Sequence, residues 1–378
     1  MRTTQHLLTL ALASAISATS ALAQGPTADF QPSATLKDTF KGAFYVGVAV
    51  NANQITGADA AGDALIVEQF DSITPENAMK WALIHPRPDA YDFTLPDKYV
   101  EFGQQHHMFI VGHNLCWHSQ TPAWVFKDDK GNPLTREALL DRLHDHIRTV
   151  VGRYKGKVQS WDVVNEALNE DGSMRQSQWE KIIGDDYVIK AFQWAHEADP
   201  AAQLNYNDYN MENPAKRKGA IELVKKLKAA GVPIAVVGSQ AHLHLSGNDA
   251  DEEAAIEDLS AAGVKVAITE LDIDVLPSTW NHTADVGVKV EEKPNMNPYP
   301  DGLPDNLQQQ LTKRCADLFA VFWKHRDVVN RVTFWGTTDK TSWLNNWPVR
   351  GRTSYPLLFD REGKPKPAFY AVLKAAQK

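Results

Sequence analysis

The chain has 378 residues, of which 43% are hydrophobic and 23% are charged, and its formal net charge at pH 7 is −8. This composition indicates a globular protein rather than a disordered one, and no apolar run beyond the N-terminus is long enough to predict a membrane-spanning helix. The negative charge argues against binding to nucleic acid or to an anionic membrane, because both need clustered Lys and Arg. We therefore expect an acidic protein that acts on neutral molecules. We also expect a monomer.

Residues 1–23 have the pattern of a secretory signal peptide. Arg2 gives the segment a positive start, residues 7–16 are mostly apolar, and small residues lead up to Ala23 as they do before a cleavage site. We expect cleavage near Ala23, a flexible segment over residues 24–35, and secretion of the mature protein into the periplasm or the medium.

Only two cysteines are present, and they lie far apart in the sequence. Cys116 ends an apolar run of strand character, whereas Cys315 lies in a stretch of helical period. Export would permit a disulfide, but this placement favours two separate buried thiols. We therefore expect a fold that does not depend on disulfide bonds.

From about residue 36 onward, short apolar runs alternate with stretches of helical period. Runs of strand character occupy residues 44–50, 72–74, 108–116, 158–165, 203–207, 234–239, 264–273 and 332–336, although the second could instead end a helix. Helical period covers residues 135–151, 185–198, 214–230, 251–262, 305–325 and 367–376. Apolar strands separated by helices favour parallel pairing, and eight such units close a barrel. We predict an α/β fold, a single (β/α)8 TIM barrel over residues 36–378.

One connection, residues 276–304, is long, rich in Pro and Asn, and without helical period. It follows the seventh predicted strand at its carboxyl end, where loops of this length often form a wall of the active site. It also contains the glycosylation sequence Asn281-His282-Thr283, which matters only if the host glycosylates its proteins.

Two carboxylates close long apolar runs of this predicted barrel. Glu166 ends the fourth run and Glu270 lies within the seventh. A carboxylate that ends a buried strand is costly unless something pairs with it or uses it, and active sites of such barrels lie at the carboxyl ends of the strands. The two side chains can point into the same space and provide the acid and the nucleophile or base that glycosidic bond cleavage needs. The alternative is that each pairs with Lys or Arg at the barrel rim.

Six short segments carry polar and aromatic residues in a distinctive order. They are Glu76-Asn-Ala-Met-Lys-Trp81, Gly112-His-Asn-Leu-Cys-Trp-His-Ser-Gln120, Trp161-Asp-Val-Val-Asn-Glu166, Asn207-Asp-Tyr-Asn210, Ile268-Thr-Glu-Leu-Asp272 and Thr341-Ser-Trp-Leu-Asn-Asn-Trp347. Together they resemble the motifs of glycoside hydrolase family ten, the retaining endo-β-1,4-xylanases. The resemblance extends from about residue 41 to the C-terminus and implies that xylan and xylo-oligosaccharides are the substrates.

The resemblance implies a role for each residue of the catalytic group. Glu166 matches the general acid/base and Glu270 the nucleophile. His242 matches the histidine that hydrogen-bonds the nucleophile, and Asp272 the carboxylate that orients this histidine. Asn165 matches the donor to the sugar 2-hydroxyl, a contact that strengthens in the transition state.

The resemblance also implies contacts with sugars on both sides of the bond that is cleaved. The matching residues are Glu76, Asn77 and Lys80 for the sugar two units from the cut on the non-reducing side, His113, Trp117, Gln120 and Gln240 for the ring that is cleaved, Trp335 and Trp343 for the aromatic walls over that ring, and Asn207 and Tyr209 for the leaving-group side. The bulk of the walls disfavours a hydroxymethyl group and thus favours xylose over glucose. Asn205 and Cys116 depart from the family pattern, and we expect neither to contact a catalytic residue.

Three other interpretations of the sequence are possible. The alternation of His242 and His244, with His113 and His118 on another strand, is compatible with a metal-dependent hydrolase, although the other strand ends carry Asn and Gln and we expect neither a metal nor a cofactor. A barrel of this kind can also bind sugar without catalysis. The third alternative is a cellulase or mixed β-glycanase, because a missing hydroxymethyl group discriminates by only ~1–3 kcal/mol.

Overall fold

A computed structural model describes residues 34–277 and 295–376 of the protein. The predicted signal peptide, most of the segment over residues 24–35, and the sequence at Asn281 therefore lie outside the described residues. The described residues from Thr35 onward belong to one compact unit. Within the described ranges, no helix has the length and apolar character required to cross a membrane.

Eight parallel strands close into a barrel, which confirms the predicted (β/α)8 fold. They are β1 (Tyr45–Val50), β2 (Ser72–Pro75), β3 (Phe109–Trp117), β4 (Ser160–Asn165), β5 (Gln203–Asp208), β6 (Val236–Ser239), β8 (Lys265–Asp274) and β9 (Val329–Phe334). Strands β1 to β6 pair in sequence order, β6 pairs with β8, and β9 pairs with both β8 and β1 to complete the ring.

Apart from shifts of one or two residues at strand ends, the barrel differs from the sequence prediction in two places. A short strand, β7 (His242–His244), pairs with β8 beyond the point where β6 leaves it, and three residues give too little alternation to predict a strand. The last strand begins at Val329 rather than at residue 332. Arg331 interrupts the apolar pattern of the sequence there. Its side chain is nevertheless buried in the protein, so a charged residue stands where the prediction expects an apolar one.

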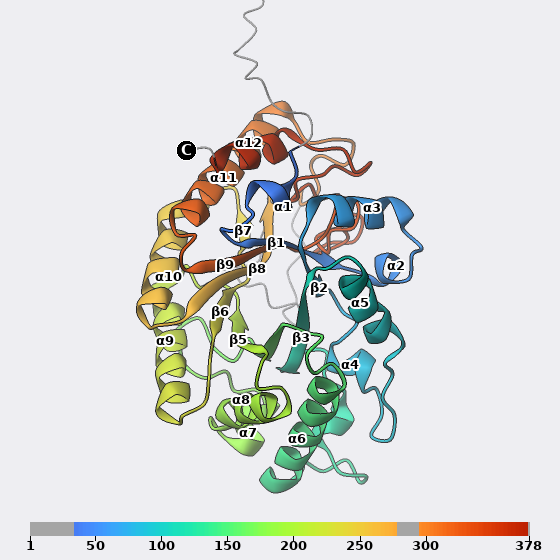
Figure 1. Ribbon diagram of the computed structural model, residues 1–378, viewed down its shortest axis with the longest axis vertical. Coiled ribbons are helices and arrows are strands. Elements are labelled where there is room, and N and C mark those ends of the chain that lie inside the picture. The colour runs from blue at the N-terminus through green and yellow to red at the C-terminus, as the bar shows by residue number, and fades with distance from the viewer. Residues whose placement is uncertain (1–33, 278–294, 377–378) are drawn as a thin grey trace, which may run out of the picture. The chain divides into compact units, whose positions relative to one another are not determined.

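Helices surround the strands (Figure 1). They are α1 (Leu36–Thr39), α2 (Ala52–Ile55), α3 (Ala60–Gln69), α4 (Trp81–Ile84), α5 (Thr94–Gln105), η1 (Ala123–Phe126), α6 (Arg136–Arg153), α7 (Gln178–Ile183), α8 (Tyr187–Ala198), α9 (Pro214–Ala229), α10 (Asp249–Ala261), α11 (Asp305–Lys324) and α12 (Pro367–Ala375). Side chains cap the first turns of α6, α9 and α10: Thr135, Asn213 and Asn248 each accept a hydrogen bond from a backbone N–H. These caps explain why the helix starts predicted from sequence lie close to the observed ones.

Cys116 and Cys315 are both buried and unbridged, which confirms the expectation of two separate thiols. Burial raises the pKa of each thiol, so neither is a reactive thiolate near neutral pH. The packing of the barrel thus provides the stability of this fold without a disulfide bond between the two cysteines.

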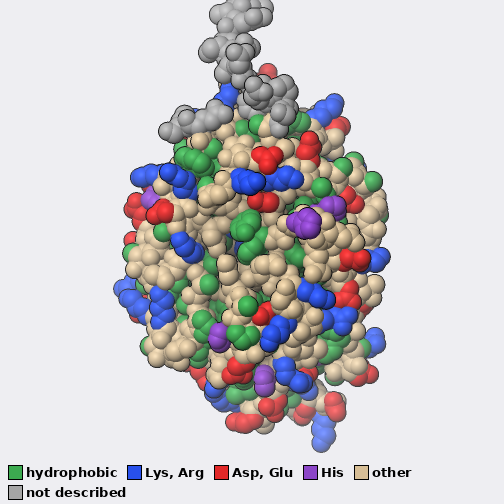
Figure 2. All heavy atoms as spheres, viewed as in Figure 1, with side chains coloured by type: hydrophobic (Ala, Val, Ile, Leu, Met, Phe, Trp, Pro, Cys, Tyr) green, Lys and Arg blue, Asp and Glu red, His purple; other side chains and the backbone are tan. Residues whose placement is uncertain are grey.

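On the face shown in Figure 2, acidic and basic side chains are interspersed rather than gathered in one patch of a single sign.

Candidate active site

A cavity of about 150 Å³ lies at the carboxyl ends of the barrel strands. Every residue that lines it was predicted as a site residue: Glu76, Asn77, Lys80, His113, Trp117, Gln120, Asn165, Glu166, Gln240, His242, Glu270, Trp335 and Trp343. Three predicted residues do not line the cavity, namely Asp272, Asn207 and Tyr209. None of the described residues of the long connection, 276–277 and 295–304, lines it either, and the rest of that connection lies outside the described residues.

The carboxyl group of Glu270 is buried among hydrogen-bond donors. Asn207 donates from Nδ2 to one carboxylate oxygen at 2.8 Å, and His242 Nε2 lies 3.2 Å from the other. The second ring nitrogen of His242 lies 3.0 Å from Oδ1 of Asp272, which stands behind the ring. The predicted chain of Asp272, His242 and Glu270 is therefore present as one continuous set of contacts.

These contacts determine the ionisation of the pair. Burial by itself lowers the pKa of His242, but the charges and hydrogen bonds of Asp272 and Glu270 outweigh it and raise the pKa to about 10. Burial likewise favours the neutral form of Glu270. The hydrogen bond from His242, the electrostatic attraction of His113 and His242, and the hydrogen bond from Asn207 outweigh burial and leave the pKa of Glu270 lowered. An imidazolium thus faces an ionised carboxylate at neutral pH, as a nucleophile requires.

The carboxyl group of Glu166 is also buried, but its partners are different. Trp117 donates from Nε1 at 2.8 Å and Gln240 from Nε2 at 3.1 Å. Burial is the largest influence and raises the pKa of Glu166, and the negative charge of Asp208 acts in the same direction against the charge of His118 and the two hydrogen bonds. The carboxyl group is thereby held in its protonated form to higher pH than an exposed glutamate, as a general acid requires.

Asn207 and Asn165 lie between the two glutamates. Nδ2 of Asn207 is 2.8 Å from the side-chain amide of Asn165, and Thr269 donates to Oδ1 of Asn207 at 2.6 Å. Asn207 is fully buried, so the role that the structure supports is to hold Glu270. The leaving-group contacts expected of Asn207 and Tyr209 stay predictions, because neither residue lines the cavity.

Lys80 connects several polar groups of the cavity wall. Its Nζ donates to Asn77 at 3.0 Å and to Gln120 at 2.9 Å, and it lies 5.0 Å from the centre of the Trp117 ring. Asn77 in turn donates to Glu76 at 3.1 Å. Lys80 immediately precedes helix α4, which places its side chain at the carboxyl end of β2. Such a row of donors and acceptors suits the hydroxyl groups of a sugar.

Tryptophans form the walls of the cavity, as predicted. Trp343 donates from its indole N–H to Asp272 at 2.6 Å, and its ring packs 5.0 Å from that of Trp347. The Trp335 ring meets that of His113 edge-on at 5.4 Å. Both walls are thus fixed by contacts with the polar residues of the site, which favours stacking against a sugar ring over a purely structural role.

Sequence reasoning missed a buried carboxylate beneath the cavity. Asp162 accepts from Nδ1 of His113 at 2.9 Å and from Asn205 at 3.1 Å. The signal was present in the sequence, because Asp162 lies within an otherwise apolar strand, where a charge needs a partner. Asn205 contacts no catalytic residue, as expected, but it holds the carboxylate that orients His113.

The donor set does not suit the metal-dependent alternative. Each nitrogen of His242 is occupied by a contact with a carboxylate, Nε2 with Glu270 and Nδ1 with Asp272. His244 does not line the catalytic cavity. Within the described ranges, the one close group of three possible ligands is Glu253, Glu257 and His325, on α10 and after α11, and it includes no predicted site residue.

A barrel whose mouth holds two buried glutamates, one of raised and one of lowered pKa, and is walled by tryptophans has the arrangement of a glycoside hydrolase. The chain belongs to glycosyl hydrolase family 10, whose model matches residues 35–375. This result confirms the family and the enzyme class that the six sequence motifs predicted.

The chain is similar in sequence to named xylanases and in fold to solved structures. The chain is 45% identical over 342 residues to endo-1,4-beta-xylanase A of Xylanibacter ruminicola, covering 90% of this chain and 93% of that protein. It is similar to a GH10 endoxylanase from a sugarcane soil metagenome, with a TM-score of 0.87, 49% identity, and coverage of 90% and 99% of the two chains. A mutant structure in complex with xylotriose gives a TM-score of 0.81 at 37% identity, with the same coverage of the two chains.

Proposed function

We propose that the protein is an endo-β-1,4-xylanase that hydrolyses internal bonds of xylan with retention of configuration. The observation that carries this proposal is the pair of buried glutamates lining one cavity, with the pKa of Glu166 raised and that of Glu270 lowered. The names of the relatives support xylan as the substrate, because one is an endo-1,4-beta-xylanase and a similar structure binds xylotriose.

In the first step, a carboxylate oxygen of Glu270 attacks the anomeric carbon while Glu166 transfers its proton to the glycosidic oxygen. The bond between that carbon and oxygen breaks, and the shorter chain leaves with a free hydroxyl group. The sugar stays attached to Glu270 as an ester. The amide of Asn165 lies beside Glu166, where it can bond the 2-hydroxyl as positive charge develops on the ring.

In the second step, Glu166 is a carboxylate and takes a proton from water. The water oxygen attacks the anomeric carbon, the ester bond breaks, and the carboxylate of Glu270 is restored. Glu166 ends the cycle protonated. Two inversions at the same carbon give net retention, and every proton transfer uses a side chain of this protein.

Time-resolved proton NMR of xylohexaose hydrolysis tests the substrate and the stereochemistry together. We expect the β-anomer of the shorter products to appear first and the α-anomer to follow by mutarotation. Early α-anomer would overturn the role of Glu270 as nucleophile while keeping the glycosidase. Activity only on cellohexaose would identify a cellulase, and inactivity on both oligosaccharides would favour a barrel that binds sugar without cleaving it.

We also propose that the protein is secreted, on the basis of the signal-peptide pattern of residues 1–23. Expression of the full-length chain in a bacterial host, followed by mass determination of the protein in the periplasm and the medium, tests this proposal. An exported protein whose first residue is Gln24 is the expected result. A full-length protein retained in the cytoplasm would contradict it.

A further inference from the structure

The main chain at Glu166 adopts an unusual conformation. Its φ is +57°, in the left-handed region that residues other than glycine seldom occupy. Such a conformation persists only where the surroundings hold it. The N–H of Glu166 donates to the carbonyl of Asn207 at 2.9 Å, which fixes one side of the residue. Trp117 and Gln240 hold the carboxyl group itself, and the group that holds the backbone carbonyl fixes the main chain from which this side chain projects.

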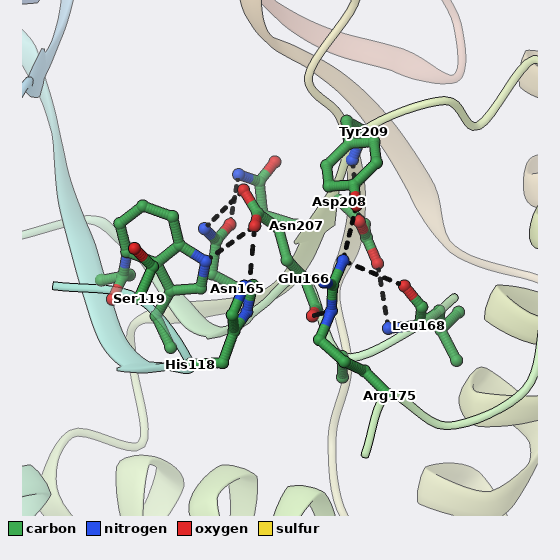
Figure 3. A network of polar contacts seen from close by, with 12 residues as sticks. His118, Ser119, Asn165, Glu166, Leu168, Arg175, Asn207, Asp208 and Tyr209 are labelled. Atoms are coloured by element: carbon green, nitrogen blue, oxygen red, sulfur yellow. Dashed lines mark hydrogen bonds and ion pairs between the residues drawn. The ribbon is translucent and has the colours of Figure 1, made fainter. Parts of the chain in front are cut away.

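Arg175 holds that carbonyl (Figure 3). Its Nε donates to the carbonyl oxygen of Glu166 at 3.0 Å, and a terminal guanidinium nitrogen donates to the hydroxyl of Tyr209 at 2.5 Å. A guanidinium is planar and presents its donors at fixed angles, so it joins the two acceptors with little freedom. One side chain thus connects the main chain of the acid/base residue to the tyrosine after β5.

The segment that carries Arg175 is itself well fixed. Residues 167–175 turn back on themselves through a bridge between Leu168 and Met174, and the N–H of Arg175 donates to the carbonyl of Ala167 at 2.7 Å. A β-carbon on Gly172, which has φ +81°, would lie 2.4 Å from the carbonyl oxygen of Ala215 on α9. The tip of the turn therefore packs directly on α9, which leaves little room for Arg175 to shift.

Tyr209, a second acceptor of Arg175, is also held in place. Nζ of Lys216 lies 3.3 Å from the centre of the Tyr209 ring and 3.0 Å from Oδ1 of Asp208. Asp208 accepts from the N–H of Tyr209 at 2.9 Å, and both Asp208 and Lys216 are completely buried. The arginine thus spans from a fixed tyrosine to the backbone of the acid/base residue.

We propose that Arg175 is a positioning residue for the acid/base Glu166, holding its left-handed backbone so that the carboxyl group faces the glycosidic oxygen. The inference rests on the proposed function, because it assumes that Glu166 transfers the proton. Loss of the guanidinium fork is then expected to impair proton donation while leaving the attack by Glu270 intact. Substrates that need no proton donation should be spared.

Two substrates, dinitrophenyl and phenyl β-xylobioside, distinguish proton donation by Glu166 from the attack by Glu270. Neither places a sugar on the leaving-group side. Dinitrophenolate leaves without a proton, whereas phenolate benefits from one, and kcat/KM reports the first chemical step for both. For Arg175→Met, we expect kcat/KM on the phenyl substrate to fall about 10- to 100-fold, against a change within about twofold on the dinitrophenyl substrate. Arg175→Lys keeps the charge without the fork and should show the same selectivity with a smaller loss.

Arg326→Met is a matched control, because Arg326 donates to the carbonyl of Trp323 at 2.8 Å on the exposed surface after α11. It should leave both rates unchanged. Equal losses on the two substrates, or none, in both the Met and Lys variants of Arg175 would overturn the inference and show a structural role only. Glu166→Ala distinguishes failure of the proposed function from failure of the role of Arg175. If this variant shows no preference for the better leaving group, or if the unmodified enzyme cleaves neither xylobioside, the proposed function fails and the inference about Arg175 fails with it.

Discussion

The surroundings of the two catalytic glutamates differ although both side chains are buried in one cavity. Around Glu270, a charged imidazolium backed by Asp272 overcomes the effect of burial and lowers the pKa. Around Glu166, the two hydrogen-bond donors are neutral, and their effect together with the electrostatic attraction of His118 does not outweigh burial and the negative charge of Asp208, so the pKa is raised. The comparison shows that residue type and depth do not assign the acid and the nucleophile, because the charge of the neighbours decides between them.

The largest expected effect comes from removing the ionised member of the pair. Glu270→Ala leaves no group to form the glycosyl ester, so we expect turnover to fall by about 10⁴-fold or more on every xylobioside, whatever the leaving group. Initial rates on dinitrophenyl β-xylobioside measure this effect. Glu257→Ala, a change on the outer surface of α10, is the control, and turnover of Glu270→Ala within tenfold of the control would assign the nucleophile elsewhere.

Glu166→Ala is expected to have a smaller effect that depends on the leaving group. Loss of the acid should lower the rate of xylan hydrolysis by about 10²- to 10⁴-fold, because general acid catalysis contributes a factor of that size to the rate. The dinitrophenyl substrate should still glycosylate Glu270, and the ester should then accumulate because no base activates water. Added azide needs no such base, so it should restore turnover and give a β-xylosyl azide. Hydrolysis of xylan at the unaltered rate would contradict the assignment.

The barrel could be predicted from the sequence because most of its strands are buried on both faces and appear as largely apolar runs. The prediction failed where that pattern fails, at the buried Arg331 in β9 and at the three residues of β7. The helix starts followed from capping residues such as Thr135 and Asn213, which act over two or three positions in the chain. Local signals therefore determine the elements, and their number determines the closure of the sheet.

The cavity lining was predictable for a different reason. Strand ends meet at one mouth, so polar residues such as Glu166 and Glu270 must converge, and the family motifs supplied their roles. The motifs also supplied the contact of His242 with Glu270, but the other supporting contacts were not predictable, because they depend on where a side chain or backbone carbonyl points. Asn207 lies against Glu270, and Arg175 reaches the backbone of Glu166, through geometry that sequence spacing does not encode.

Changing the charge behind His242 tests the nucleophile side of the comparison. Asp272→Asn removes the anion that keeps His242 protonated, so burial should lower the pKa of His242 and weaken its hold on ionised Glu270. The pKa of Glu270 then rises. Because kcat/KM requires Glu270 as a carboxylate, the acid limb of its pH profile should move upward by about one unit.

The basic limb should stay in place for Asp272→Asn, because it reports the protonation of Glu166. Asp251→Asn, which changes an exposed carboxylate at the start of α10, is the matched control and should move neither limb. An acid limb that stays fixed in Asp272→Asn would mean that the imidazolium does not determine the ionisation of Glu270.

The smallest expected effect is on the acid side, where a single neutral donor is removed. Trp117→Phe deletes the N–H that bonds Glu166 at 2.8 Å, a bond that lowers the pKa of this carboxyl group against the larger effect of burial. The pKa of Glu166 should therefore rise, and since kcat/KM needs the protonated acid, the basic limb should move to higher pH by about half a unit. Trp124→Phe is the control, because its N–H donates at 3.1 Å to the carbonyl of Pro86, outside the cavity. A shift of the acid limb instead would reverse the assignment of the two glutamates, since each limb reports one of them.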